Sequence, residues 1–512
     1  MTKFASLTQI MKKWFASPWY PFVFALYPVL ALLAANVGQV EVSAGARPLL
    51  ISIAGAGTLF LLLRLLLRDW HRAAFLSTLL LALFFSYGHV YNLLIVQFPK
   101  INFTPWLLAS WGVLALLFIW WATRPKLNFA TSAVALNVIA LGLVITSLTQ
   151  IGFDVEKEPV DPLPAQNAPA ETLTLPQNPP DVYYFILDMY TRADLMKSAY
   201  DYDNSGFVNE LQKRGFYVAS CSQSNYTRTE LSVASSLNMS YLQDLDSQFD
   251  DVKSTARLHL WDTLKHSTVR YNLEQLGYKT ISYANGYAWS ELSDTDVFLT
   301  PPPFSSGMTE FEALFLQTTL AREAQDVGWL DADQIAGQNY RDRDMLVFNS
   351  MKKVANMSGP KFVYVHLILP HPPFVFGPDG TYTNPADFWN EQKLYPADKF
   401  EVGYTNQVTF LNKKLLETVD TILSESKNPP IIILQGDHGP WLQPNPQHFF
   451  ILNAYYLPGY TDKLYPNISP VNSFRLVFDS YFGGKYDMLK DQTYFSPVPD
   501  VYNFSEVSNP CK

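Results

Sequence analysis

Cysteine is almost absent from this chain of 512 residues. Its two cysteines, Cys221 and Cys511, are too few for a disulfide scaffold and do not have the spacing of a zinc motif. The sequence also lacks an internal repeat and a glycine-rich phosphate loop. Its net charge of −9 argues against a nucleic-acid partner. These absences disfavour a disulfide-rich module, a repeat protein, a P-loop enzyme and a nucleic-acid-binding protein.

Charge is scarce as well, because 16% of the residues are charged and 48% are hydrophobic. The first 150 residues are overwhelmingly apolar, and the remainder has ordinary globular composition. Each of five apolar segments approaches the ~20 residues that span a bilayer as a helix. These segments lie at about 19–37, 48–67, 73–95, 105–123 and 128–148. The sequence therefore predicts a transmembrane domain with five helices over residues 1–150.

Basic residues orient these segments. They lie before the first segment, between the second and third, and between the fourth and fifth, whereas the opposite loops hold only Arg47 and Lys100. The set consists of Lys3, Lys12, Lys13, Arg68, Arg72, Arg124 and Lys126. By the positive-inside rule the N-terminus is cytoplasmic, and an odd number of spans places everything after residue 150 outside.

A proline-rich, acidic stretch follows, which we interpret as a linker over residues 151–180. The part from Phe153 to Pro180 cannot bury a core and is expected to be an extended tether. A peptide substrate motif is the less favoured alternative. Residues 181–512 form the predicted catalytic domain.

Three apolar runs in that domain have the composition of buried strands. They are DVYYFIL at 181–187, KFVYVHLIL at 361–369 and IIIL at 431–434. Stretches with helical spacing lie between them. Strands that alternate with helices in this way predict an α/β sandwich with a largely parallel central sheet.

Polar side chains follow two of these strands. Asp188 ends the first run, and Asp437 and His438 come shortly after the last. Because catalytic groups of open α/β sheets gather at the carboxyl ends of strands, these side chains are candidates to hold a divalent metal. The alternative is a turn in which Asp437 caps a helix and His438 is incidental.

A threonine opens a helix between these sites. The apolar spacing places Thr227 or Thr229 at the helix N-terminus, with Glu230 favouring the first turn. The hydroxyl is either a simple N-cap or a nucleophile. The second alternative suits a phosphate or sulfate substrate, since backbone N–H groups and the helix dipole stabilise incoming negative charge.

Taken in this order, the motifs resemble those of the alkaline phosphatase/sulfatase superfamily over about residues 180–490. Five spans before an outward catalytic domain is the layout of its lipoteichoic acid synthases and lipid A phosphoethanolamine transferases. The resemblance implies one divalent metal, with Zn or Mn expected and a second, transient ion left open. The metal ligands that it implies are Asp188, Thr229, Asp437 and His438.

The resemblance also implies that Thr229 is the catalytic nucleophile. The pattern Thr229-x-x-Ser232-Val233 is similar to the segment that follows the nucleophile in the phosphoethanolamine transferases, and this similarity favours Thr229 over Thr227.

Three further residues are candidates to bind the substrate, and His366 is expected to have a structural role. His371 and His448 lie where the family places histidines that bind the substrate phosphate. Arg192 is either an anion clamp or one half of an ion pair with Asp194 or a neighbour. His366 is expected to be a packed or second-shell histidine rather than a ligand.

The chain also departs from the family. The transferases usually carry Glu where this chain has Asp188, and Met189 follows in place of a second aspartate, which favours one tightly held metal. The sulfatase signature Cys-x-Pro-Ser-Arg is missing and Thr229 cannot become formylglycine, so a classical sulfatase is disfavoured.

The expected function is transfer of a phospho-headgroup, of phosphoglycerol or phosphoethanolamine type, through a phosphothreonine. The expected partners are the membrane, a phospholipid donor and a glycan or lipid acceptor of the cell envelope. The expected location is the bacterial inner membrane, with the catalytic domain on the periplasmic or extracellular side. The alternatives are a phosphatase, phosphodiesterase or sulfatase-type hydrolase, and a non-catalytic membrane protein with an inactive hydrolase domain.

Two details stay open in the sequence. An outward domain lies in an oxidising compartment, so Cys221 and Cys511 either form a disulfide or leave Cys511 in a frayed tail. His266 lies in a helical stretch with no evident partner and is expected at the surface.

The topology is testable with fusions. A reporter enzyme that is active only in the cytoplasm is expected to be inactive when fused after Gln150, because the lysine and arginine asymmetry places this position outside. A fusion after Arg68, in a predicted cytoplasmic loop, is the matched control and should be active. Reporter activity after Gln150 would contradict the five-span topology.

Overall fold

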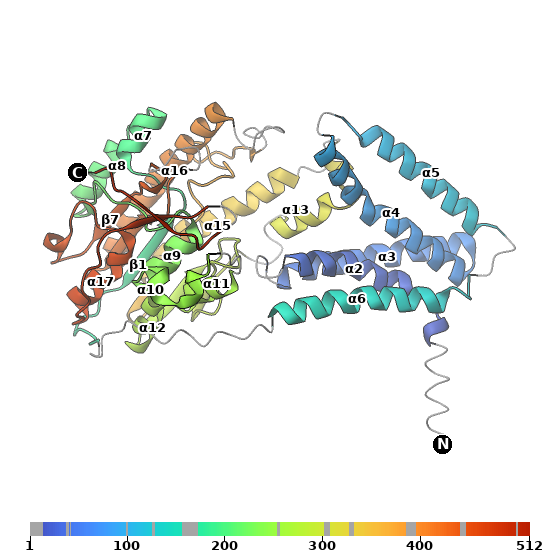
Figure 1. Cartoon of the computed structure of the whole chain (residues 1–512), viewed down its shortest axis with the longest axis horizontal. Helices are drawn as coiled ribbons and strands as arrows, with labels where there is room; N and C mark the ends of the chain where they lie inside the picture. Colours follow the sequence, from blue (N-terminus) through green and yellow to red (C-terminus); the bar gives the residue numbers. More distant parts are fainter. Residues whose placement is uncertain are drawn as a thin grey trace, which may run out of the picture. The chain divides into compact units, whose positions relative to one another are not determined.

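The computed structural model describes residues 14–36, 40, 42–98, 101–124, 129–155, 173–252, 257–301, 308–326, 332–385, 396–440, 447–497 and 500–511. The chain divides into two units, which are described separately. The first consists of Met1–Glu158 and Met308–Ala332, and the second of Pro159–Gly307 and Asp333–Lys512. The first is built from helices and the second around a sheet (Figure 1).

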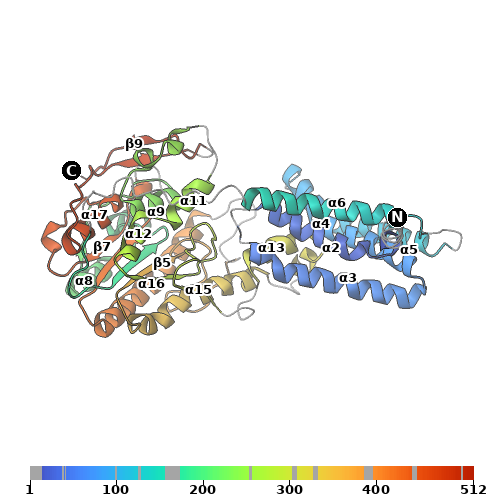
Figure 2. The ribbon, with the colours of Figure 1, turned by 90° about the horizontal axis from the view of Figure 1, so that it is seen from below.

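Apolar helices make up the first unit (Figure 2). Those long and apolar enough to cross a membrane are α3 (Ala46–Leu67), α4 (Trp70–Gln97), α5 (Thr104–Ala122) and α6 (Ala133–Val155). The predicted first segment forms α2 (Tyr20–Ala35), whose 16 residues reach about 24 Å, against about 30 Å for the hydrocarbon core. The described part of the chain thus has four helices of spanning length, and the count of five stays a prediction.

Basic side chains gather at one end of these helices. Arg72 donates hydrogen bonds from Nη1 to the carbonyl oxygens of Ala122 and Arg124, each at 2.9 Å. The guanidinium of Arg64 lies over the ring of Trp70, 4.7 Å from its centroid. The cations that the positive-inside rule assigns to the cytoplasmic face therefore lie near one another.

A segment from later in the chain packs onto the first unit. Its helix α13 (Glu310–Gln317) starts with a capping box between Thr309 and Glu312. Glu312 also forms a salt bridge with Arg47, at the end of α3 that is predicted to lie outside. A Cβ at Gly88 would lie 2.1 Å from the last carbonyl oxygen of α13, so this approach requires glycine. Residues 308–326, which composition grouped with the catalytic domain, therefore pack with the membrane helices.

Within the described residues, the second unit contains a seven-stranded sheet in the order β2-β7-β6-β1-β5-β3-β4. The strands are β1 (Val182–Leu187), β2 (Tyr217–Val218), β3 (Lys279–Tyr283), β4 (Val297–Leu299), β5 (Lys361–Leu367), β6 (Ile431–Gly436) and β7 (Asn453–Tyr456). β1 pairs in parallel with β5 and β6, and β3 pairs in parallel with β4 and β5. β7 runs antiparallel to β2 and β6. The sheet is therefore mixed, with a parallel central part around β1.

Helices cover both faces of this sheet, so that β1 is buried throughout. Val182, Tyr184 and Ile186 pack on one side, against α9 (Thr229–Asn238), α11 (Leu258–Lys265), α12 (Thr268–Gln275) and α17 (Pro470–Tyr481). Tyr183, Phe185 and Leu187 pack on the other, against α7 (Ala193–Tyr200), α8 (Ser205–Lys213), α15 (Ala332–Ala355) and α16 (Ala397–Glu425). This arrangement is an α/β/α sandwich, and it explains why the strand reads as a continuous apolar run.

Most of the predicted linker, residues 156–172, lies outside the described residues. Helix α6 continues to Val155. Thr174 already pairs with the second unit, since its N–H donates to the carbonyl oxygen of Phe482 at 2.8 Å. Asn428 donates to the carbonyl oxygen of Pro179 at 3.0 Å, so the end of the predicted linker is held against the sheet unit.

The two cysteines form a disulfide. Cys221 and Cys511 have Cα atoms 5.7 Å apart and are separated by 290 residues in sequence. A crosslink that closes so long a loop contributes about 6 kcal/mol in the chain-entropy model. The side chain of Asn509 also donates to the carbonyl oxygen of Cys221 at 3.0 Å. The structure therefore contains the disulfide rather than a frayed C-terminus, and the residues around Cys511 are held against the second unit.

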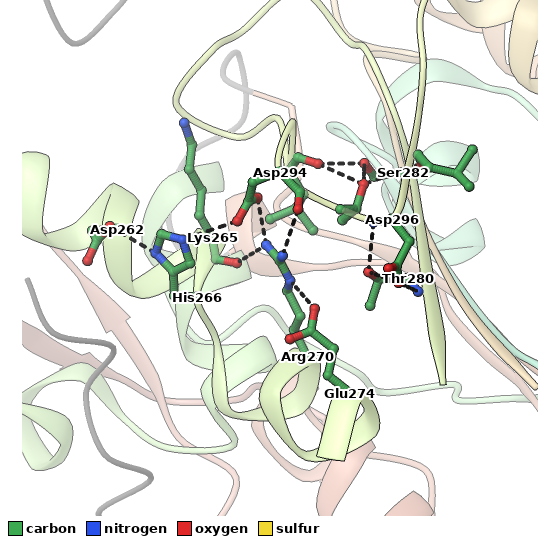
Figure 3. Close-up of polar contacts among 12 residues, drawn as sticks. Asp262, Lys265, His266, Arg270, Glu274, Thr280, Ser282, Asp294 and Asp296 are labelled. Atoms are coloured by element: carbon green, nitrogen blue, oxygen red, sulfur yellow. Dashed lines mark hydrogen bonds and ion pairs between the residues drawn. The ribbon is translucent and has the colours of Figure 1, made fainter. Parts of the chain in front are cut away.

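A polar network holds the edge of the sheet next to β4 (Figure 3). His266, expected without a partner, contacts Asp262 at 2.9 Å and Asp294 at 3.3 Å. Arg270 binds the same Asp294 at 2.7 Å. Hydrogen bonds from the two carboxylates raise the pKa of His266 to about 9. The loop before the short edge strand is therefore fastened to α11 and α12.

The network makes the stability of this edge depend on pH. The pKa of His266 is raised from 6.5 to about 9, so its contribution is complete below pH 6.5 and is lost as the pH rises through 9. Because the side chain is 41% exposed, we expect only about 1 kcal/mol after solvent screening. In His266→Asn, amide exchange of residues 293–299 should be several-fold faster at pH 6 and unchanged near pH 10.

The matched control is His259→Asn. His259 pairs with Asp246, outside this network, and its replacement should leave exchange in residues 293–299 unaltered. An effect of His266→Asn that persists undiminished at pH 10 would mean that packing, rather than charge, holds the edge.

Candidate metal centre and active site

The register of the sheet brings Asp188 and Asp437 together. Leu187 of β1 pairs with Gly436 of β6, and each is followed by one of the two aspartates. Both carboxylates are buried, with 5% and 1% exposure. A Cβ at Gly436 would lie 2.3 Å from the carbonyl oxygen of Tyr190, so glycine is needed for the turn after β1 to pass this close.

Backbone groups orient the Asp437 carboxylate. Its Oδ1 accepts hydrogen bonds from the N–H of Met189 and the N–H of His438, each at 2.9 Å. Met189 has a φ of +66°, a left-handed conformation that is unfavourable for a residue with a side chain. This strained turn directs the Met189 N–H at Asp437 and leaves Oδ2 for another partner.

The ring of His438 completes the group. Its Nδ1 lies 2.8 Å from the carbonyl oxygen of Gly439, and its Nε2 lies 3.7 Å from Oδ1 of Asp188 and 3.6 Å from Oδ2 of Asp437. A Cβ at Gly439 would lie 2.8 Å from the carbonyl oxygen of His448, so the chain after His438 also requires glycine.

Thr229 lies beside Asp437 at the start of a helix. It is the first residue of α9, and its side chain is half-buried. The Thr229 hydroxyl interacts with the Asp437 carboxylate and offsets a small part of the rise in the pKa of Asp437 that burial causes. A hydroxyl, a carboxylate and the N-terminus of a ten-residue helix therefore meet at one point.

Thr227 has a different environment. Its hydroxyl accepts a hydrogen bond from the N–H of Ser496 at 3.0 Å and is buried. The N–H of Tyr494 in β8 (Thr493–Phe495) donates to the carbonyl oxygen of Asn225 at 2.8 Å. The C-terminal tail thus supports the segment that leads to Thr229, and the Thr227 hydroxyl is part of that support.

Atoms suited to a metal converge at this edge. Oδ1 of Asp188, Oδ2 of Asp437 and Nε2 of His366 are buried, and each makes no hydrogen bond of regular geometry within the described part of the chain. Ligand atoms of these three residues lie within 4.8 Å of one another. Buried carboxylates are costly unless a cation neutralises them, and carboxylate oxygens with imidazole nitrogens suit divalent metals such as Zn²⁺. The residues present therefore fit one divalent ion.

The two carboxylates differ in pKa. Burial raises the pKa of Asp188, but the interactions of its carboxylate with His371, His366 and His438 outweigh burial and lower it to about 2. Burial and the neighbouring charge of Asp188 raise the pKa of Asp437. Like charges held side by side in this way are relieved by a bound cation.

His371 and His448 lie beside the cluster in different ways. His371 is half-buried, and it is near enough to Asp188 for its charge to lower the pKa of that residue. The ring of His448 stacks on His438, with centroids 5.2 Å apart, and its Nε2 donates to the carbonyl oxygen of Thr227 at 2.7 Å. Burial, together with the charge of His438, lowers the pKa of His448 to about 4, so it is neutral at neutral pH. A substrate-binding role for either stays a proposal.

Arg192 is engaged by protein groups. Its guanidinium binds both carboxylate oxygens of Asp194 at 2.7 Å and lies 4.0 Å from the ring centroid of Phe450. Nη1 also donates to the carbonyl oxygen of Ser222 at 3.2 Å. These contacts match the ion pair, the second of the two alternatives for Arg192.

His366 lies closer to the centre than sequence reasoning indicated. It comes near the end of β5, and its Nε2 lies 3.6 Å from Oδ2 of Asp188. His366 is at this edge because β5 pairs in parallel with β1, so the two strands end together. The sequence shows that His366 is near the end of a strand, but it does not show which strand is the neighbour of β1.

Comparison with protein-family models and with curated proteins gives no match. Solved structures do resemble the fold. The integral membrane lipooligosaccharide phosphoethanolamine transferase A (EptA) from Neisseria meningitidis is 13% identical with a TM-score of 0.39, over 90% of this chain and 95% of that chain.

Two further solved structures are similar to about two thirds of this chain. The C-terminal periplasmic domain of EcEptC from Escherichia coli is 12% identical with a TM-score of 0.42, over 64% of this chain and 93% of that chain. The lipoteichoic acid synthase LtaP from Listeria monocytogenes is 12% identical with a TM-score of 0.35, over 63% of this chain and 80% of that chain. Similarity at this level does not identify a shared activity, so the case for function rests on the residues of this chain.

Proposed function

We propose that this chain is a membrane-bound, metal-dependent transferase. It moves a phospho-headgroup, of phosphoglycerol or phosphoethanolamine type, from a lipid to a glycan or lipid of the bacterial cell envelope. The observation that supports this is the meeting of the Thr229 hydroxyl with Asp437 at the helix N-terminus, beside the unpaired oxygen of Asp188 and Nε2 of His438.

The proposed reaction has two displacements. In the first, Oγ of Thr229 forms a bond to the phosphorus of the donor, and the bond from phosphorus to the lipid alcohol oxygen breaks. The proton of Thr229 ends on that oxygen, and the lipid alcohol leaves. In the second, a hydroxyl oxygen of the acceptor attacks the phosphorus, and the bond from phosphorus to Oγ of Thr229 breaks. The proton of the acceptor hydroxyl ends on Oγ, which restores Thr229.

The residues around Thr229 have distinct tasks in this reaction. Asp188, Asp437 and His438 would hold a divalent cation together with the Thr229 oxygen. A bound cation supplies Lewis-acid activation of the hydroxyl and offsets negative charge on the phosphate. The N–H groups at the start of α9 face the incoming anion. His371, when protonated, adds positive charge near the phosphate.

The membrane helices support a lipid donor. Four helices of spanning length anchor the chain in a bilayer, which keeps the catalytic unit close to lipid headgroups. The orientation expected from the basic residues places this unit on the periplasmic or extracellular side of the inner membrane, where envelope glycans and lipids are the available acceptors.

Thr229 and Thr227 make a matched pair of test positions. Thr229→Ala should abolish turnover of a phospholipid with a labelled headgroup while expression and fold persist, because Arg228 is the N-cap of α9 and alanine is a good helix former at the first helical position. Thr227→Ala removes a hydroxyl two residues away that accepts from the N–H of Ser496 at 3.0 Å and donates to the carbonyl oxygen of Tyr494 at 3.4 Å. Both contacts are structural, so this change should cost far less activity. Mass spectrometry of the quenched reaction should find the headgroup phosphate on Thr229.

The products distinguish transfer from hydrolysis. Label that appears on an envelope glycan or lipid supports the transferase, whereas label released to water would show a phosphodiesterase at the membrane surface. Full activity in Thr229→Ala with loss in Thr227→Ala would place the nucleophile two residues earlier, and full activity in both would exclude this chemistry.

A further inference from the structure

His366 has two possible relations to the metal site. Its Nε2 lies 3.6 Å from Oδ2 of Asp188, and its side chain is buried. By distance it could join Asp188 and Asp437 as a ligand. A metal binds only a ring nitrogen that carries no proton, so the role of His366 depends on its tautomer.

Asn285, in the loop after β3, determines that tautomer. Oδ1 of Asn285 accepts the backbone N–H of Tyr287 at 2.8 Å. Because a backbone N–H can only donate, this contact fixes the amide and turns Nδ2 away from it. Nδ2 lies 2.9 Å from Oγ of Ser290 and 3.0 Å from Nδ1 of His366.

An amide nitrogen can only donate, so Nδ1 of His366 must accept. The hydroxyl of Ser290, 3.3 Å from the same Nδ1, can donate as well. The proton of the neutral ring is therefore on Nε2. That N–H faces Oδ2 of Asp188 at 3.6 Å and makes no hydrogen bond of regular geometry to a described residue.

His438 has the opposite tautomer. Its Nδ1 lies 2.8 Å from the carbonyl oxygen of Gly439, which can only accept, so Nδ1 carries the proton. Its Nε2 is left with a lone pair, 3.7 Å from Asp188 and 3.6 Å from Asp437. The two histidines at this centre thus present different atoms to it, a lone pair from His438 and an N–H from His366.

We infer that His366 is a positioning residue, which holds the Asp188 carboxylate in place through Nε2–H, and that Asn285 keeps His366 in the tautomer this requires. Hydrogen-bonded partners of this kind orient a metal ligand without touching the metal. The inference rests on the proposed metal site and is independent of the proposed reaction.

The test measures metal binding without substrate. Full-length protein in detergent is freed of metal by chelation and titrated with Co²⁺, whose visible absorption reports the set of ligands. In His366→Leu the bound spectrum should match that of the wild type, and the affinity should fall about 10–100-fold. In His438→Leu, which removes a ligand, the spectrum itself should change.

Asn285→Leu tests the second half of the inference. Leucine cannot donate to Nδ1 of His366, so the proton is no longer confined to Nε2 and the contact of Nε2–H with Asp188 is weakened. Its Co²⁺ affinity should fall as in His366→Leu, and the double variant should lose no more than either single variant. Because Asn285 lies outside the ligand set, this variant also keeps the test valid if His366→Leu fails to fold.

Three results would overturn the inference. A spectrum of His366→Leu that changes as His438→Leu does would make His366 a ligand. Unchanged affinity in both His366→Leu and Asn285→Leu would remove any positioning role. Losses that add in the double variant would show that Asn285 does not act through His366. Absence of transferase activity, with these metal results intact, would instead contradict the proposed reaction alone.

Discussion

Two carboxylates buried side by side are the constraint on which the rest of the second unit depends. Asp188 and Asp437 follow neighbouring parallel strands, and both are almost fully buried. Unpaired buried carboxylates are destabilising, so such a pair persists only where a cation or strong donors offset the charge. The strained turn at Met189, the close approach at Gly436 and the ring of His438 all serve to place or neutralise these two groups.

The strand-end acids were predictable because each follows a continuous apolar run, and the carboxyl ends of parallel strands share one edge. The antiparallel strand β7 was not predictable, because its four residues, Asn453–Tyr456, have no distinctive pattern. The tautomer of His366 was equally hidden, because it depends on Asn285, 81 residues earlier in the chain. Contacts that join distant segments through single hydrogen bonds leave no periodic signal in a sequence.

Residues 308–326 show the same limit at the level of domains. Their composition is ordinary for a globular domain, yet they pack with apolar helices through the salt bridge of Glu312 with Arg47 and the narrow contact at Gly88. Each partner is unremarkable alone, because an arginine at a helix start and a glycine within an apolar helix are both common. The positive-inside rule assigned Arg47 to the outer face, and the segment meets the helix end that bears it.

The most direct test of the account is to locate the metal. Crystals of the full-length protein soaked in Zn²⁺ should give an anomalous scattering peak at the zinc edge between Oδ1 of Asp188, Oδ2 of Asp437 and Nε2 of His438, about 2.0–2.2 Å from each. The Thr229 oxygen should lie next to the ion, and His366 should lie outside its coordination sphere. No peak at this position, while Zn²⁺ is bound elsewhere in the second unit, would contradict the assignment of the active site.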